Sequence, residues 1–267
     1  MTQAKILSRG MGSGAPLISL LNVDFAFRTE KGRSIRVLRD IQLAVENTEI
    51  LAVLGPSGSG KTTLLRILAG LLAPTAGKIT SDPALMAQRG LGMTMVFQRP
   101  TLLPWLSVEE NVLLPYRLAR LRVDEAVRHE LENLFRLVHL QGFRNSYPHE
   151  LSGGMQMRAA LVRALLPKPR LILMDEPFSS LDEATRLELC IEMLRLVRAV
   201  SSSVVFVTHS IQEAALVASR VLQMSARPGR IVAEVVPPFS WPRDQDLLER
   251  PEFVEFCKLL RKQLVHD

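Results

Sequence analysis

The chain has little of several features that would narrow its function. Its 267 residues include only two cysteines, Cys190 and Cys257, and neither lies at a metal-ligand spacing. A disulfide scaffold and a cysteine metal centre are therefore excluded, and a reducing compartment fits. No run without charge approaches the roughly 18 residues that a membrane span needs, and no apolar stretch of signal-peptide type follows the N-terminus. We expect a chain that stays in the cytosol.

Aromatic residues are also few, at 5%, while hydrophobic residues make up 47% of the chain, enough for a large core. There is no internal repeat and no low-complexity tract. The formal charge is +6 and the pI is about 9.7. Such a surface attracts nucleic acid and anionic lipid alike, so charge alone does not choose between them.

The most informative segment is a glycine-rich loop. Residues 55–62 read Gly-Pro-Ser-Gly-Ser-Gly-Lys-Thr, after the apolar run Ile50–Leu54 and before a predicted helix, Thr62–Ala69. Glycines let backbone N–H groups turn onto phosphate oxygens, and the helix points its positive end at the same anion. Lys61 can reach the β- and γ-phosphates, and Thr62 can ligate Mg²⁺. The residues expected to hold ATP here are Gly55, Pro56, Ser57, Gly58, Ser59, Gly60, Lys61, Thr62 and Thr63.

A second apolar strand ends in two acids. Residues 171–177 read Leu-Ile-Leu-Met-Asp-Glu-Pro. Acidic residues often end strands, but after a P-loop this pattern indicates a Walker B strand. Asp175 is then expected to hold Mg²⁺, and Glu176 to polarise the attacking water as a general base.

These motifs, with Leu-Ser-Gly-Gly-Met at residues 151–155, make the sequence resemble the ATP-binding cassette (ABC) ATPases, from about Ile18 to about Val236. The resemblance implies an α/β fold. Its P-loop NTPase core would have a mostly parallel sheet, an antiparallel β part near the N-terminus and an inserted α-helical subdomain. It also implies ATP hydrolysis with ATP and Mg²⁺ in the site.

The resemblance assigns further roles residue by residue. Gln98 matches the Q-loop glutamine, a catalytic and metal-sensing position, and His209 matches the catalytic switch histidine. Asp182 matches the D-loop, and Phe27 matches the aromatic that stacks on adenine. The alternative for Phe27 is plain strand packing, since Phe25 lies two residues away. The signature residues that would contact the nucleotide are Ser152, Gly153 and Gly154.

In this family two cassettes meet head to tail, and the signature of one closes on the nucleotide held by the other. A serine hydroxyl and helix N-terminal amides opposite a P-loop would make ATP the bond between the copies. Because the chain has one P-loop and one signature, we expect a second copy or a paralogue as partner, with a homodimer favoured.

Within the family, the chain resembles the ATPase subunit of bacterial importers of the nitrate/sulfonate/taurine group. The resemblance rests on residues 96–105, on Ser225–Ile231 and on the tail from Arg243 to Phe253. Ser210 and Met157 depart from the group, which usually has Asp and Gln there.

The importer interpretation implies a peripheral location on the cytoplasmic face of the inner membrane, with integral-membrane permease subunits and, indirectly, a solute-binding protein as partners. The alternative is a soluble ABC ATPase acting on a nucleic-acid complex, although no nucleic acid is expected.

The predicted layout has three parts, the second with an inserted subdomain. Residues 1–16 form a flexible tail, residues 17–236 the ATPase domain with a helical subdomain at about 99–165, and residues 237–267 a C-terminal helical extension. Caps at Ser107, Ser152 and Asp182 are predicted to open three helices.

Residues 99–105 are apolar and stiffened by Pro100 and Pro104, so we expect a permease contact at Leu102, Leu103 and Trp105. The alternative is that these side chains pack the helical subdomain.

Overall fold

The structure, a computed structural model, describes residues 15–28, 32–87 and 91–265. The predicted tail at residues 1–16 lies almost wholly outside the described residues. The chain divides into two compact units. The first comprises the residues up to Asp82 together with those from Val205 onward, and the second comprises Pro83–Val204.

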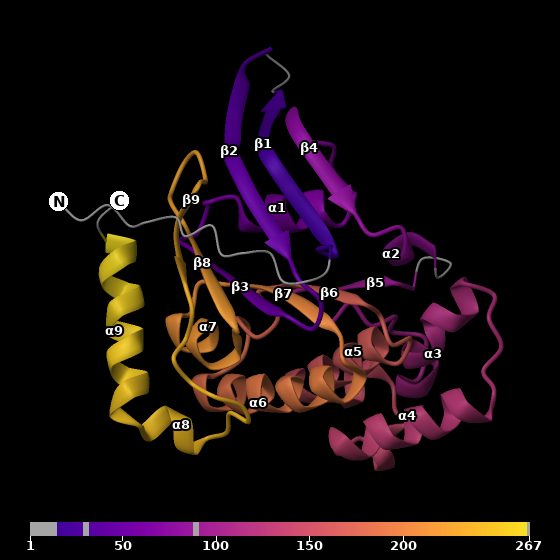
Figure 1. The fold of residues 1–267 in the computed structure, drawn as a ribbon. Helices are drawn as coiled ribbons and strands as arrows, with labels where there is room; N and C mark the ends of the chain where they lie inside the picture. Colours follow the sequence, from indigo (N-terminus) through magenta and orange to yellow (C-terminus); the bar gives the residue numbers. More distant parts are fainter. Residues whose placement is uncertain (1–14, 29–31, 88–90, 266–267) are drawn as a thin grey trace. The chain divides into compact units, whose positions relative to one another are not determined.

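The first unit begins with an antiparallel sheet. Strand β1 (Ile18–Arg28) lies between β2 (Ser34–Val45) and β4 (Ala76–Ser81) (Figure 1). Alternate residues of β1 are buried, as expected for a sheet with one face on the core. This is the antiparallel part predicted near the N-terminus.

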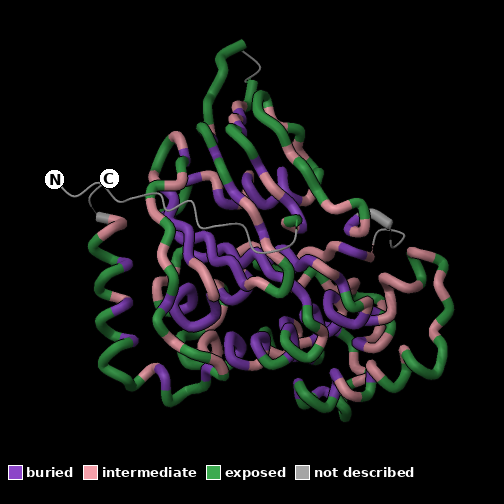
Figure 2. Tube along the Cα trace, in the orientation of Figure 1, coloured by how far each residue is buried: buried purple, intermediate pink, exposed green. Residues whose placement is uncertain are grey.

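A second group of strands in this unit carries the P-loop. Strand β3 (Ile50–Leu54) is buried throughout and pairs in parallel with β8 (Arg220–Met224), and β9 (Ile231–Val235) runs antiparallel to β8. Strand β7 (Ser203–Thr208) neighbours β3. A continuous apolar strand is what a sheet covered on both faces requires, and β3 is buried along its whole length in Figure 2.

The helices of the first unit are α1 (Lys61–Leu68), α7 (Ile211–Val217), α8 (Asp246–Glu249) and α9 (Pro251–Val265). Helix α9 buries one face, which carries Phe253, Phe256 and Leu260, and it packs against α7 (Figure 2). The Gln223 side chain of β8 also donates to the carbonyl oxygen of Leu260 in α9, at 3.0 Å. The C-terminal segment is therefore docked onto this unit.

The second unit combines a parallel strand pair with helices. Strand β5 (Met93–Val96) pairs in parallel with β6 (Leu171–Asp175). The other elements of this unit are α2 (Ala84–Ala87), α3 (Val108–Leu118), α4 (Glu125–Leu137), α5 (Gly153–Leu165), α6 (Glu183–Val200) and two short 3₁₀ turns, Gln141–Phe143 and Pro148–Glu150.

The predicted helix caps are confirmed. Ser107 forms a reciprocal capping box with Glu110 at the start of α3, Ser152 caps α5 and Asp182 caps α6. Within the described ranges, no helix is both long and apolar enough to cross a bilayer. The architecture confirms the predicted α/β class with its antiparallel N-terminal sheet.

Candidate functional site

The P-loop connects β3 to α1. Gly58 and Gly60 have φ values of 80° and 93°, a left-handed conformation that glycine adopts without a steric penalty. Gly60 is also the N-cap residue of α1, and its carbonyl oxygen accepts the first helical hydrogen bond from Leu64 at 2.8 Å. The backbone amides at the start of α1 therefore follow directly on the loop, as a phosphate-binding turn requires.

Lys61 is folded back onto its own loop. Its Nζ donates to the carbonyl oxygens of Gly55 at 2.8 Å and Pro56 at 3.0 Å, and the residue is 5% exposed. Carbonyl oxygens are weaker partners for an ammonium group than charged oxygens are. A phosphate at the loop could therefore take over these bonds, so the residues present fit a nucleotide triphosphate.

Phe27 and Phe25 differ in environment although both lie on β1. Phe25 is buried, at 6% exposed, whereas Phe27 is 44% exposed, and the two rings lie nearly perpendicular with centroids 4.8 Å apart. Phe27 faces Ile35 across the strand pair, and Ile35 is 55% exposed. Of the two aromatics, Phe25 therefore belongs to the core, and Phe27 is the one that solvent reaches.

His209 follows β7 directly and lies in a tightly bonded turn. Thr208 Oγ1 donates to Glu213 Oε2 at 2.6 Å and accepts from the backbone N–H of Ser210 at 2.9 Å. The Ser210 hydroxyl in turn accepts from the backbone N–H of Glu213 at 3.3 Å, which caps α7. Ser210, the departure noted above, thus performs the capping role that an aspartate would have there. Glu213 is a contributor that the sequence analysis did not find.

The signature lies at the start of α5, in the second unit. Ser152 Oγ accepts from the backbone N–H of Met155 at 3.3 Å. A Cβ atom on Gly153 would lie 3.6 Å from the Leu181 side chain, and one on Gly154 would lie 3.4 Å from the Thr185 side chain. The two signature glycines therefore bring α5 against the start of α6.

Asp182 and Arg158 hold this arrangement together. The Asp182 carboxylate accepts from the backbone N–H of Thr185 at 3.0 Å, and this bond lowers the pKa of Asp182 below its ordinary value. Arg158 of α5 bonds Glu192 of α6 through Nε at 2.8 Å and Nη2 at 2.9 Å, and it also pairs with Glu188 at 3.2 Å. Hydrogen bonding to Glu192 raises the pKa of Arg158. The helix that carries the signature is thereby fixed to the helix that Asp182 begins.

Asp175 is the last residue of β6, and Glu176 comes directly after it. Glu176 has φ 46°, a left-handed conformation that side-chain-bearing residues rarely adopt. Its carbonyl oxygen accepts from both the backbone N–H and the hydroxyl of Ser179, at 3.2 Å and 2.9 Å. Strained backbone at a strand end is a common property of catalytic positions, and these bonds hold it in place.

The segment after Gln98 is held rigidly from two sides. Buried Asn111 of α3 accepts from the Leu103 backbone N–H at 2.7 Å and donates back to its carbonyl oxygen at 3.1 Å. Arg163 of α5 donates to the carbonyl oxygens of Pro100 at 2.8 Å and Thr101 at 2.9 Å. The outcome for the predicted apolar surface is mixed. Trp105 is 69% exposed, whereas Leu102 and Leu103 are half-buried.

The predicted site residues are divided between the units. Phe27, the P-loop residues Gly55 to Thr63 and His209 belong to the first, where β3 and β7 are neighbours. The second unit contains Gln98, Ser152, Gly153, Gly154, Asp175, Glu176 and Asp182.

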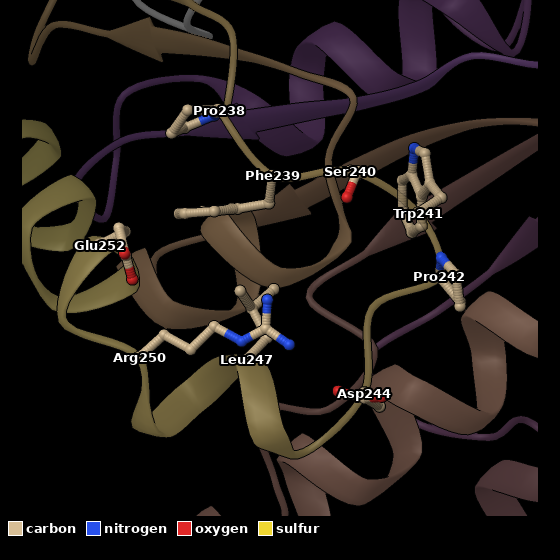
Figure 3. Close-up of a pocket in the computed structure, with 9 residues that line it drawn as sticks. All are labelled: Pro238, Phe239, Ser240, Trp241, Pro242, Asp244, Leu247, Arg250 and Glu252. Atoms are coloured by element: carbon tan, nitrogen blue, oxygen red, sulfur yellow. The ribbon is translucent and has the colours of Figure 1, made fainter.

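A cavity of about 360 Å³ lies in the C-terminal segment and contains none of these residues. In Figure 3, Phe239 and Trp241 line one side of it, with Leu247 and Arg250 on the other. We place the functional site at the P-loop rather than in this cavity, because phosphate groups are bound by backbone amides on a loop and need no enclosed pocket.

Comparisons with known proteins agree with this geometry. The sequence model of the ABC transporter family matches residues 38–179. A taurine import ATP-binding protein of Pelagibacter ubique is 41% identical over 87% of this chain and 89% of its own length. An aliphatic sulfonates import ATP-binding protein of Bacillus cereus is 37% identical over 81% of this chain and 85% of its own. A dimeric ATP-binding cassette solved in a post-hydrolysis state with ADP and Pi superposes with a TM-score of 0.70 at 29% identity, covering 84% of this chain and all of that one.

A P-loop, a signature helix and an acid-ended strand on this fold define a nucleotide-hydrolysing ATPase of the cassette type. The chain belongs to the ABC transporter family. It is an ATP-binding ATPase of that family.

Proposed function

We propose that this chain is the ATP-hydrolysing subunit of an importer that takes up a small solute of the nitrate, sulfonate or taurine kind. The observation that carries this proposal is the P-loop between β3 and α1, in which the Lys61 ammonium group is hydrogen-bonded to the loop's own carbonyl oxygen at Gly55. The identity to taurine and sulfonate import proteins over most of the chain supports the importer class. Only the basic charge favours the nucleic-acid alternative, and charge of this size is common on solvated surfaces.

The proposed nucleotide site gives each predicted residue a role in binding or in hydrolysis. Residues Gly55 to Thr63 would bind the phosphates and the exposed ring of Phe27 would stack on adenine. Glu176 would take a proton from the attacking water as general base, and Gln98 and His209 would orient that water and the γ-phosphate. In-line attack on the γ-phosphate then gives ADP and inorganic phosphate.

Mg²⁺ would supply charge neutralisation on the β- and γ-phosphates. Thr62, Asp175 and Gln98 are the proposed protein ligands. The described part of the chain has no group of three or more His, Cys, Asp or Glu side chains arranged for a metal. This fits Mg²⁺, which takes only one or two carboxylates and fills its other positions with phosphate oxygens and water.

A second copy of the chain would complete each site. Ser152, Gly153, Gly154 and Asp182 of one copy would face the P-loop of the other, and ATP-driven closure of this homodimer would power transport. The related cassette solved as a dimer with ADP and Pi supports this assembly. The chain would sit peripherally on the cytoplasmic face of the inner membrane, with a solute-binding protein acting on the far side.

The proposed permease contact is the segment from Gln98 to Trp105. Asn111 and Arg163 fix the backbone of residues 100–103, so this part of the segment needs no further ordering when a partner binds the exposed Trp105. A short permease helix could cover Trp105, as aromatic anchors are covered in other interfaces.

The test measures ATP binding, ATP hydrolysis and uptake in a strain that contains the permease with which this chain assembles. We expect Lys61→Ala to lose ATP affinity and uptake together, because the γ-phosphate then loses the ammonium group that would neutralise its charge. Trp105→Ser should keep ATP binding by the isolated subunit but lose co-purification with the permease. Leu118→Ser, at a residue that is 75% exposed and outside this segment, is the matched control. Uptake that survives both Lys61→Ala and Trp105→Ser would contradict the proposal.

A further inference from the structure

The P-loop is supported by a turn that none of the predicted roles includes. This turn, Ser225–Arg230, connects β8 to β9 and is closed by its own bonds. The backbone N–H of Ser225 donates to the carbonyl oxygen of Arg230 at 2.9 Å, and the backbone N–H of Arg230 donates to the Ser225 hydroxyl at 3.2 Å. These two hydrogen bonds give the turn a defined shape without a bound ligand.

Two backbone hydrogen bonds fix the turn to strand β2. The backbone N–H of Gly229 donates to the carbonyl oxygen of Val37 at 2.8 Å, and the backbone N–H of Arg39 donates to the carbonyl oxygen of Gly229 at 3.0 Å. The intervening Leu38 forms a bridge with Gly229. Strand β2 and the turn thus make one continuous support.

The P-loop backbone lies directly on this support. A Cβ atom built on Gly229 would stand 1.9 Å from the carbonyl oxygen of Ser59, which no real side chain tolerates. A Cβ atom on Gly60 would stand 2.7 Å from the Leu38 side chain and 3.1 Å from Val37. Glycine is required at both positions, because neither leaves room for a side chain. The backbone of Gly229 packs against the P-loop backbone, and that of Gly60 packs against side chains of β2. The shape of loop residues 58–60 is therefore set from outside the loop.

Arg227 projects from the same turn onto the phosphate-binding loop. A Cβ atom on Gly58 would lie 3.3 Å from Arg227 Nη2 and 3.5 Å from its Nε, so the guanidinium covers that glycine at van der Waals distance. Among the residues that the structure describes, no carboxylate pairs with Arg227, and its side chain is exposed. Its charge is therefore available to an anion at the loop.

We propose that Arg227 is a second cation of the nucleotide site, beside Lys61, and that Gly229 seats the turn that carries it. Arg227 acts through space: its charge attracts the triphosphate to a loop whose form Gly229 and β2 maintain. The role of Arg227 is electrostatic and that of Gly229 is positioning, and both rest on the proposed binding of ATP at the P-loop. An exposed charge acting in this way is screened by salt, which gives the role a signature of its own.

The test is the equilibrium affinity for ATP of the purified full chain, measured by fluorescence or calorimetry at low and at high salt. We expect Arg227→Ala to weaken ATP binding by about three- to tenfold at low salt, with the difference shrinking toward none at high salt. Arg227→Lys should restore most of the affinity, and Arg227→Glu should weaken it further. Binding of ADP, which carries less charge, should change less than binding of ATP.

Arg230→Ala is the matched control, since it removes the same charge from an exposed residue of the same turn. Equal losses for Arg230→Ala and Arg227→Ala would overturn the proposal, because net charge alone would then explain both. An unchanged affinity in Arg227→Ala, with wild type binding ATP, would overturn it as well. Failure of wild type to bind ATP would instead overturn the proposed P-loop function, and this inference with it.

The seat itself is tested by Gly229→Ala, which we expect to lose more ATP affinity than Arg227→Ala because Ser59 must move. Gly142→Ala is its control, at a glycine whose added Cβ would meet nothing within 4 Å. Circular dichroism melting separates a displaced loop from an unfolded chain. Native affinity in a folded Gly229→Ala variant would contradict the proposed seat, and the Arg227 series remains decisive if this variant does not fold.

Discussion

Thr208 and Glu213 are joined by a 2.6 Å hydrogen bond from the threonine hydroxyl to the buried carboxylate. The same hydroxyl accepts from the backbone N–H of Ser210, so the bonds enclose His209 in the turn between β7 and α7. Both Thr208 and Glu213 are almost completely buried, at 1% and 2% exposed. The backbone that carries the proposed switch histidine is therefore fixed by a buried hydrogen bond.

Removing the Thr208 hydroxyl should displace His209 without touching the P-loop. We expect Thr208→Val, which keeps the side-chain shape, to lower turnover about tenfold and to cost about 1–3 kcal/mol in the free energy of unfolding, because Glu213 loses a partner. ATP affinity should stay within about twofold of wild type. Thr208→Ser restores the hydroxyl and should recover turnover. Full turnover in Thr208→Val would show that this bond does not position the histidine.

Glu176→Gln tests the proposed general base. The amide keeps the size and hydrogen bonding of the side chain but cannot take up a proton, so we expect turnover to fall by about 10²- to 10⁴-fold. ATP should still bind, and with Mg²⁺ it should hold the chain as a dimer in gel filtration. Glu183→Gln, at an exposed acid in the first turn of α6, is the control and should behave as wild type. Near-normal turnover in Glu176→Gln would remove Glu176 from the mechanism.

Much of the fold could be predicted from local signals. The buried run Ile50–Leu54, the glycines after it and the caps at Ser107, Ser152 and Asp182 were all visible in the sequence. These signals act over a few residues, through side-chain period, φ preference and capping bonds. The element boundaries differ slightly: the helix predicted over Thr62–Ala69 spans Lys61–Leu68.

The long-range supports of the site could not be predicted. Gly229 meets Ser59, and Arg227 covers Gly58, only because the parallel pairing of β3 with β8 brings the turn after β8 to the loop after β3. In the sequence, Ser225–Ile231 stood out only because it resembles the same segment of an importer group. That resemblance did not explain why an arginine and a glycine are needed there. Glu213 was likewise hidden, because an acid in the first turn of a helix is usually solvent-exposed.

Cys257 should be a slow nucleophile. Burial of the half-buried side chain raises the pKa of its thiol to about 11, opposed only in part by Arg261. The thiolate, which is the reactive form, is therefore scarce near neutral pH. We expect alkylation by iodoacetamide at pH 8 to be at least about tenfold slower than that of glutathione, and to keep rising with pH beyond 10. Mass spectrometry of wild type and Cys257→Ser, which retains only buried Cys190, assigns the reaction.

The raised pKa also has a consequence for stability. Because the folded-state pKa lies above the unfolded value, the contribution of this thiol is complete below the unfolded pKa and is lost as pH rises toward 11. Urea unfolding at pH 8 and pH 10 should show a smaller decrease for Cys257→Ser than for wild type. A fast reaction at pH 8, or the same pH dependence in both proteins, would contradict the assignment.

Arg243 connects the C-terminal segment to the helix that follows His209. Its Nη1 donates to three carbonyl oxygens at the end of α7, those of Ala215 at 3.1 Å, Leu216 at 3.0 Å and Ala218 at 2.7 Å. Its guanidinium also lies 4.2 Å from the Trp241 ring centroid and 5.7 Å from that of Phe239. A cation at the C-terminal end of a helix satisfies carbonyls that have no partner within the helix, and the two rings add cation–π attraction.

Arg243→Ala should therefore destabilise the protein by about 2–4 kcal/mol, because a buried charged group and its hydrogen bonds are lost together. Arg243→Lys keeps the charge but not the planar fork, and should recover only part of this stability. Arg250→Ala, at an exposed arginine of the same segment, should change stability by less than about 0.5 kcal/mol. Urea unfolding measures all three. Because α7 begins beside His209, loosening its far end should also lower turnover in Arg243→Ala at a temperature where the variant is folded. Wild-type stability in Arg243→Ala would show that the C-terminal segment is held without this arginine.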